Sequence, residues 1–386
     1  MSYQDWAVLI ITLSGIIIYG VYKSRTTKNL DGYFLSNRDM PWYLVLLSIM
    51  GTQASAITFI SAPGQAYTDG MRFVQYYFGL PLAMIVICIV FVPVFNRLKV
   101  YTAYEFLEKR FDLKTRTLTS FLFQISRGLS TGISIYAPSL ILSSLLGWNI
   151  YYTNIIMGGM LIIYTVTGGA RAVAHTQKLQ LIIIITGMVI AGYLVVHLMP
   201  SGVGFIDALH LGGKNGKMNI ITSGQTATGF DWKDKYNIWS GVIGGFFLAL
   251  SYFGTDQSQV GRYLTAKNNK QSKLGLLMNG IIKVPMQFLI LMLGVLVFSF
   301  YQYNKAPIHF NQTQIEKAKE TSYKNELNQL ESTYAKLAPD DNAQKSKIKT
   351  EYSAVLSNAL PGEDVNDTNY IFPRFVIDYL PKGLVG

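Results

Sequence analysis

The amino-acid sequence predicts an all-α integral membrane protein, and three observations support this fold class. Of the 386 residues, 50% are hydrophobic and only 14% are charged, and the mean hydropathy is +0.27. These values are typical of membrane proteins. Apolar segments of about 20 residues, the length at which a helix crosses the hydrocarbon core, recur along the chain. Short loops that contain basic residues separate them.

Eight segments are long and apolar enough to be predicted membrane spans. The first is followed by KSRTTKN rather than by a small-residue cleavage site, so we expect a retained helix and not a signal peptide. The predicted spans are residues 6–22, 41–66, 73–95, 117–146, 151–166, 179–199, 238–260 and 274–301.

The loops between these spans predict the topology, because loops rich in lysine and arginine stay on the cytoplasmic side. We therefore expect a multi-pass protein of the plasma membrane with an extracellular N-terminus. The same loops account for the net charge of +11 without a nucleic-acid partner. The basic residues follow the first, third, fifth and seventh spans: Lys23, Arg25, Lys28 and Arg38; Arg97, Lys99, Lys109, Arg110, Lys114 and Arg116; Arg171 and Lys178; Arg262, Lys267, Lys270 and Lys273.

Two of the predicted spans are interrupted by polar residues and glycines. The stretch GTQASAITFISAPGQ occupies residues 51–65, and the stretch GVIGGFFLALSYFGTDQSQVG, which overlaps the span predicted at 238–260, starts at residue 241. A helix broken within the bilayer is tolerated where its backbone lines a cavity, so each stretch is a candidate binding site. Five spans separate the two, an odd number, which predicts an inverted repeat. Close packing of helices at small residues is the alternative explanation.

This count predicts how the chain is organised. Residues 304–386 form a long polar segment on the outer side, and weak helical periodicity within 322–356 predicts a soluble helical hairpin, with a disordered linker as the alternative. The expected units are an extra N-terminal helix with its loop (1–40), a first five-helix repeat (41–199), an extracellular loop (200–237), the first two helices of a second repeat (238–303), and the outer segment (304–386).

Three runs of residues resemble the sodium/solute symporter family. They are YFLSNRDMPWYLVLLSIMGTQASAITFISAPGQAYTDG, YTVTGGARAVAHTQKLQ and FGTDQSQVGRYLTAK, and the similarity covers nearly the whole chain up to the outer segment. The resemblance implies an inverted-repeat helical bundle of the leucine-transporter type, preceded by one extra helix. Where the family commonly has an acidic residue after the threonine at the start of its fifth core helix, this chain has Gln177.

The resemblance also implies a sodium site. In the family a sodium ion lies between the first broken helix and the eighth core helix, and the matching positions here are the backbone carbonyls of Gly51 and Ala54. The sequence reaches Gly386 where that eighth helix is expected to begin. We therefore expect an incomplete second repeat, and residues 1–386 by themselves are expected to insert into a membrane without transporting.

Arg127 lies about 15 Å into the third core helix, at 1.5 Å per residue. A charge at that depth needs a partner or a cavity. One hypothesis is a clamp for a substrate carboxylate, which a guanidinium matches with two hydrogen bonds. The alternative is a structural contact with Asp256 or with carbonyls freed at a helix break. An arginine here resembles the sialic-acid branch of the family, in which case Ser55, Thr58 and Gln75 would contact the solute.

Lys283 is the second cation predicted to be buried in the membrane. A lysine at this place in the family's sugar cotransporters interacts with the broken sixth helix, so we predict a structural ion pair between Lys283 and Asp256. Tyr252 and Phe253 flank that break. They either cover the ring of a substrate or only pack.

The predicted function is sodium-coupled secondary active uptake of a small organic solute, with a carboxylate-bearing sugar such as sialic acid as the first candidate. Uptake of a neutral sugar or polyol and a symporter-like sensor domain are the alternatives. The sequence has no GxxxxGK[ST] loop for ATP. Its one cysteine, Cys88, and its scattered histidines show no metal-ligand spacing, and we expect no enzyme activity.

Overall fold

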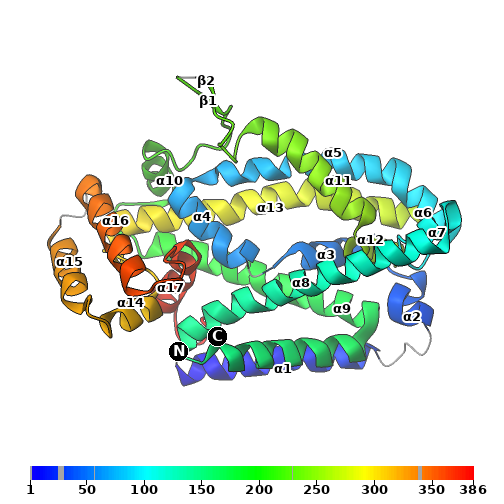
Figure 1. The fold of residues 1–386 in the computed structure, drawn as a ribbon, viewed down its shortest axis with the longest axis horizontal. Helices are drawn as coiled ribbons and strands as arrows, with labels where there is room; N and C mark the ends of the chain where they lie inside the picture. Colours follow the sequence, from blue (N-terminus) through cyan, green and yellow to red (C-terminus); the bar gives the residue numbers. More distant parts are fainter. Residues whose placement is uncertain (1, 25–29, 56, 228, 338–340) are drawn as a thin grey trace.

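The computed structural model describes residues 2–24, 30–55, 57–227, 229–337 and 341–386. Within them the chain is almost entirely helical, and the long helices lie side by side as an elongated bundle (Figure 1). A small helical group, α14 to α17, covers one end of the bundle. An all-α bundle agrees with the fold class that the sequence predicts.

Helices from the first half of the chain are distributed through the whole bundle (Figure 1). They are α1 (Tyr3–Ser24), α2 (Leu30–Leu35), α3 (Trp42–Gln53), α4 (Ala62–Asp69), α5 (Leu80–Val86), α6 (Val92–Leu98), α7 (Glu105–Arg110), α8 (Leu113–Leu146) and α9 (Ile150–His197). Wider or tighter helical turns at Ile57–Ser61, Met71–Tyr77 and Ile87–Phe91 join some of them.

The second half adds a long central helix and the outer group. Its elements are α10 (Phe205–Lys214), strands β1 (Gln225–Thr226) and β2 (Gly229–Phe230), the turn Ser240–Gly244, α11 (Gly245–Thr255), α12 (Gln257–Leu264), α13 (Asn269–Tyr303), α14 (Gln312–Lys319), α15 (Lys324–Lys336), α16 (Asn342–Ala359) and α17 (Ile371–Tyr379). The helices expected within 322–356 are present as α15 and α16, and apolar residues of α14 to α16 form their own small core.

Side-chain caps set where the long helices begin. Asp112 accepts a hydrogen bond from the Thr115 amide before α8, and Asn268 accepts one from the Gln271 amide before α13. Each cap satisfies an amide that has no partner within its own helix. These polar caps lie at the helix ends, outside the apolar runs.

Two spans expected from the sequence are the two arms of α9, which bends at Gly169. This glycine has φ 57° and ψ −173°, a conformation that residues with a side chain rarely adopt. A Cβ atom there would lie 3.0 Å from Tyr33 in α2. The bend therefore turns the chain back at the end of the bundle where the basic loops lie.

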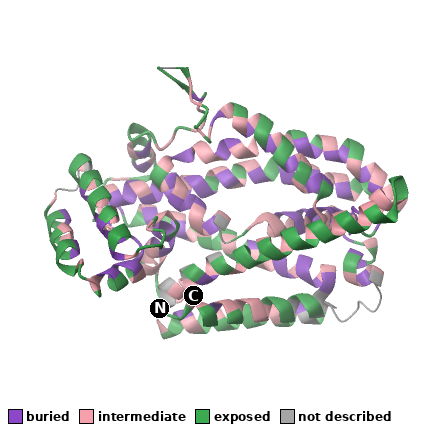
Figure 2. Cartoon of the chain, in the orientation of Figure 1, coloured by how far each residue is buried: buried purple, intermediate pink, exposed green. Residues whose placement is uncertain are grey.

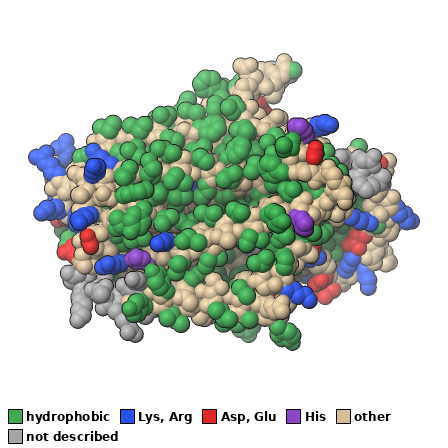
Figure 3. All heavy atoms as spheres, turned by 180° about the vertical axis from the view of Figure 1, so that it is seen from behind, with side chains coloured by type: hydrophobic (Ala, Val, Ile, Leu, Met, Phe, Trp, Pro, Cys, Tyr) green, Lys and Arg blue, Asp and Glu red, His purple; other side chains and the backbone are tan. Residues whose placement is uncertain are grey.

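The sides of the bundle carry an apolar belt (Figure 3), and many residues there are exposed (Figure 2). Among the described residues, four helices are long and apolar enough to cross a membrane, or five if the bent pair α3 and α4 counts as one span. The other expected spans are shorter or more polar. The apolar stretches Ile150–Ile163 and Ser240–Thr255 are short, and hydroxyls and Arg127 reduce the hydropathy of α8.

The central helix α13 packs against α3, α4 and α5. Its contact with α4 is closest at Gly294, where a Cβ atom would lie 2.1 Å from the Pro63 carbonyl oxygen. Glycine at this position lets the two backbones touch, as small residues do between membrane helices.

The variant Gly294→Ala is expected to destabilise the protein by roughly 1–3 kcal/mol, because the added methyl overpacks a backbone contact that cannot yield. Thermal unfolding of the purified protein in detergent measures the change. The matched control is Gly187→Ala in α9, where nothing lies within 4 Å of the added atom. Equal behaviour of the two variants would contradict the proposed α13–α4 contact.

Candidate functional site

The first broken helix consists of α3 and the helical segment that follows it. Helix α3 ends at Gln53, Ala54 is extended with ψ 90°, and the segment from Thr58 to Asp69 turns away by 73°. In a continuous helix the amides of Ser55 and Thr58 would donate to the carbonyls of Gly51 and Ala54. Here they donate to Gln53 O and Ser55 O instead, each at 3.0 Å. The carbonyl oxygens of Gly51 and Ala54 are thus released from their helical donors.

Gln177 on α9 fastens the end of α3 beside this break. Its side-chain oxygen accepts a hydrogen bond from Ser48 Oγ at 3.0 Å, and its nitrogen donates to Thr52 Oγ1 at 3.1 Å. Thr52 in turn donates to the Ser48 carbonyl at 2.8 Å. A Cβ atom on Gly51 would lie 2.7 Å from the Gln177 Cβ, so the glycine allows this approach. Sequence reasoning noted Gln177 only as a departure from the family and did not predict this role.

The second break falls at Asp256, which is extended with ψ 116° between α11 and α12. Its carboxylate accepts from the Ser258 amide at 2.8 Å and so caps α12. The Tyr263 hydroxyl donates to the Phe253 carbonyl at 3.1 Å, which satisfies an acceptor freed at the end of α11. The buried Gln259 side chain donates to the Tyr252 hydroxyl at 2.8 Å.

Arg127 forms an ion pair with Asp256, with 2.8 Å between Arg127 Nη2 and Asp256 Oδ2. The predicted ion pair between Asp256 and Lys283 is wrong, because α8 brings Arg127 to this carboxylate and Lys283 Nζ has no hydrogen-bond partner among the described residues. Arg127 Nε is buried without a hydrogen-bond partner, and its guanidinium lies 5.8 Å from the centre of the Phe123 ring. The structural contact that the sequence left as an alternative is present.

Lys283 belongs to a polar stripe on α13, together with Asn279 and Gln287. The three residues are four apart, so they lie on one helix face, and each is at most 1% exposed. Their five side-chain nitrogen and oxygen atoms have no hydrogen-bond partner among the described residues. Lys283 Nζ lies 5.8 Å from the centre of the Tyr77 ring. Unpartnered polar atoms within a membrane bundle are costly, so this stripe is a candidate functional site.

Of the other predicted solute contacts, Tyr252 lines a pocket together with Asp256, the partner of Arg127, whereas Ser55, Thr58, Gln75 and Phe253 do not line it. The Gln75 side chain is fully buried and contacts the outer loop: its nitrogen donates to Thr222 Oγ1 and to the Tyr236 carbonyl, each at 3.1 Å. Phe253 is fully buried in an apolar cluster. Ser55 is exposed and Thr58 half-buried at the first break.

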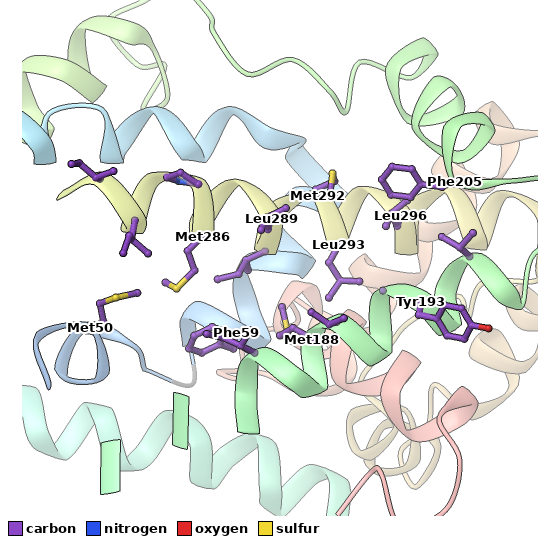
Figure 4. A pocket seen from close by; sticks show the side chains of 18 residues that line it. Met50, Phe59, Met188, Tyr193, Phe205, Met286, Leu289, Met292, Leu293 and Leu296 are labelled. Carbon is purple, nitrogen blue, oxygen red and sulfur yellow. The ribbon is translucent and has the colours of Figure 1, made fainter. Parts of the chain in front are cut away.

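A pocket of about 410 Å³ lies against the second break, and Tyr252 and Asp256 line it. A second pocket, of about 790 Å³, lies between α9 and α13 next to the first break. Figure 4 shows Met50, Phe59, Met188 and Met286 among the side chains that line it. The second pocket is almost wholly apolar and contains none of the charged groups described above, so it is not a site for a polar solute.

Two broken helices in an all-α membrane bundle, each with polar groups at the break, define the architecture of a secondary transporter. The sequence pattern of the sodium:solute symporter family matches residues 33–323. The chain belongs to this family, which confirms the resemblance seen in the sequence. Because the family consists of transporters, it also confirms that the chain is not an enzyme.

Individual relatives agree. The human sodium/iodide cotransporter is 29% identical over 304 residues, covering 78% of this chain and 45% of the relative. Sodium-coupled monocarboxylate transporter 1 of Xenopus laevis is 29% identical, covering 78% and 47%. The Vibrio parahaemolyticus sodium/glucose cotransporter is 28% identical, covering 76% and 55%. The chain therefore spans about half the length of these curated relatives.

A solved structure agrees in fold. It is the substrate-bound outward-open state of a Na+-coupled sialic acid symporter, and it matches with a TM-score of 0.76 at 23% sequence identity. The match covers 100% of this chain and 68% of that one.

A double-mutant cycle of Arg127→Gln and Asp256→Asn is expected to give a coupling energy of roughly 1–3 kcal/mol, because the contact is charge-assisted and Asp256 is only 14% exposed. Asparagine still caps α12, so the cycle isolates the ion pair. Free energies of unfolding in detergent provide the measurement. The pair of Arg116 and Glu108, each 37% exposed, is the control and should give at most about 1 kcal/mol. A coupling no larger than the control would mean that the Arg127–Asp256 pair contributes little.

Proposed function

We propose that this chain contributes the solute and sodium sites of a sodium-coupled symporter that takes up a small organic carboxylate by alternating access. The observation that carries the proposal is the first helix break, where the amides of Ser55 and Thr58 leave the carbonyls of Gly51 and Ala54. Carbonyl oxygens are ligands suited to a hard cation such as Na+. Sodium is then cargo that moves with the solute.

The carboxylate preference rests on the cations of the bundle. Arg127 already has a carboxylate partner in Asp256, with its Nε still unpartnered, whereas Lys283 has no acidic partner among the described residues. An incoming carboxylate would satisfy either cation. Two of the relatives reported above are named for anions, iodide and monocarboxylates, and the solved structure is of a sialic acid symporter.

Sialic acid is the first solute to test. Its carboxylate would meet Arg127 or Lys283, and its hydroxyls would meet Ser55, Thr58 and the amides of Asn279 and Gln287. Tyr252 lines the pocket at the second break and would lie against the sugar ring. Gln75 and Phe253 are both fully buried, so their proposed role is to stabilise the site by packing.

A neutral sugar or polyol is the second candidate. The unpartnered amides of Asn279 and Gln287 carry both donors and acceptors, which suit hydroxyl groups, and a glucose cotransporter is among the relatives. In either case we propose a plasma-membrane location with the N-terminus outside, as the basic loops predict.

Uptake by the full-length protein in proteoliposomes is expected to require sodium, because the released carbonyls need a cation to offset their loss of donors. Replacement of sodium by choline should abolish gradient-driven accumulation. Potassium replacement with the same ionic strength is the control for salt effects. Undiminished accumulation in choline would contradict sodium coupling.

Competition by acidic sugars should exceed competition by their neutral counterparts in the wild-type protein. Arg127→Lys keeps the charge but loses the planar fork, and should weaken acidic-solute binding by roughly 1–3 kcal/mol if Arg127 holds the carboxylate. Lys283→Met keeps the length of the side chain without its charge, and it should weaken acidic-solute binding if Lys283 holds the carboxylate.

The control for Lys283→Met is Lys270→Met, an exposed position on the same helix. If neutral and acidic sugars compete equally in the wild type, the carboxylate proposal fails and the neutral-sugar reading replaces it. If only one of the two cation variants loses acidic-solute binding, that residue is the carboxylate contact.

A further inference from the structure

A third pocket, of about 490 Å³, lies at the end of the bundle that helices α14 to α17 cover, and it shares no lining residue with the two pockets described above. Its walls come from the end of α4, the end of α13, the loop after α10, and helices α15 and α16 (Figure 1). Helix α15 begins at Lys324 and α16 at Asn342, so both lie beyond residue 323, where the family match ends. One side of this pocket is thus built from a part of the chain that the family pattern does not include.

Three lysines line this outer pocket: Lys217, Lys345 and Lys349. No aspartate or glutamate is among the described residues that line it. Lys349 Nζ lies 5.4 Å from the centre of the Phe310 ring and 5.8 Å from that of Tyr334. Burial lowers the pKa of both Lys349 and Lys217, since each ammonium has lost part of its hydration.

The acids that act electrostatically on Lys217 and Lys349 are Asp69 and Asp367, and each has another partner. Asp69 pairs with Arg72 at 3.0 Å. Asp367 accepts from the Phe310 amide at 2.8 Å, and its carboxylate lies 3.3 Å from His309 Nδ1. Among its described residues the lining of the pocket thus carries lysines and no carboxylate, and Lys217 Nζ donates to the Thr68 carbonyl.

The Tyr301 hydroxyl supplies a second, independent sign of a ligand. Tyr301 is 2% exposed and lines the pocket, and its hydroxyl is buried without a hydrogen-bond partner among the described residues. The ring of Phe298 and the hydroxyls of Thr350 and Ser353 complete the wall. Cations, an unpartnered donor and aromatic faces together fit an anion with an apolar or ring-shaped body.

We propose that this outer pocket binds a small organic carboxylate independently of sodium and independently of the site at the helix breaks. The carboxylate lies among the three lysines, and its apolar body lies against Phe298 and Tyr334. The walls belong to α4, α13 and α16. A bound anion therefore contacts both α16 and α4, the second half of the first broken helix. Such a site collects the solute on the outer face before it reaches the breaks.

The test is equilibrium binding of radiolabelled benzoate to the purified full-length protein in sodium-free choline buffer, with the neutral isostere benzamide as competitor. Saturable benzoate binding is expected, and benzamide should compete at least about tenfold less well, because it lacks the charge that the lysines contact. Lys349→Gln and Lys217→Gln should each weaken benzoate binding about tenfold or more. These two positions lie on separate segments, so a folding defect in one variant leaves the other informative.

Two control variants separate this site from others. Lys347→Gln changes an exposed lysine on the same helix as Lys349, and should leave binding unchanged. Lys283→Met alters the site at the helix breaks, and should also leave sodium-free binding unchanged. No saturable benzoate binding, wild-type binding in both Lys349→Gln and Lys217→Gln, or loss of binding in Lys283→Met would overturn the proposal. Displacement by chloride or sulfate at the concentrations at which benzoate binds would also overturn it, in favour of an inorganic anion.

Discussion

The structure depends on how backbone groups are satisfied where a helix breaks inside an apolar bundle. In hydrocarbon an unpaired amide or carbonyl costs several kcal/mol, so a break persists only if other groups replace the lost bonds. At the first break, Gln177 binds the side chains of Ser48 and Thr52 and so fixes the end of α3. At the second break, Asp256 and Tyr263 supply the cap and the donor that the helix lost.

The charged side chains of the bundle also need partners in the apolar interior. Asp256 serves two purposes, because its carboxylate caps α12 and also neutralises Arg127 from α8. Lys283 then lacks an acidic neighbour among the described residues, and it lies on one face of α13 with two unpartnered amides. Helix α13 thus combines a buried polar stripe with a glycine contact to α4, which belongs to the first broken helix. A solute that satisfies the stripe would act on the helix that touches the broken one.

Sequence reasoning located the apolar helices, the two interruptions, the intramembrane Arg127 and the family, because each of these leaves a local signal in composition or in a motif. It wrongly predicted Lys283 as the partner of Asp256. It also predicted that Gln75 contacts the solute, whereas in the structure this side chain contacts the loop at Thr222 and Tyr236. These assignments depend on which helix faces which. That information is not contained in the spacing along one helix.

The sequence by itself determined that this chain is a helical membrane protein with interrupted spans within residues 51–65 and 241–261, because hydropathy and helix-breaking residues act locally. Only the tertiary structure decided that Gln177 fastens the first break, that Arg127 rather than Lys283 meets Asp256, and that lysines from two distant segments line one outer pocket. The physical reason is that a hydrogen bond or an ion pair requires two groups within a few ångströms. Residues 129 positions apart, such as Arg127 and Asp256, come that close only when the helices have packed.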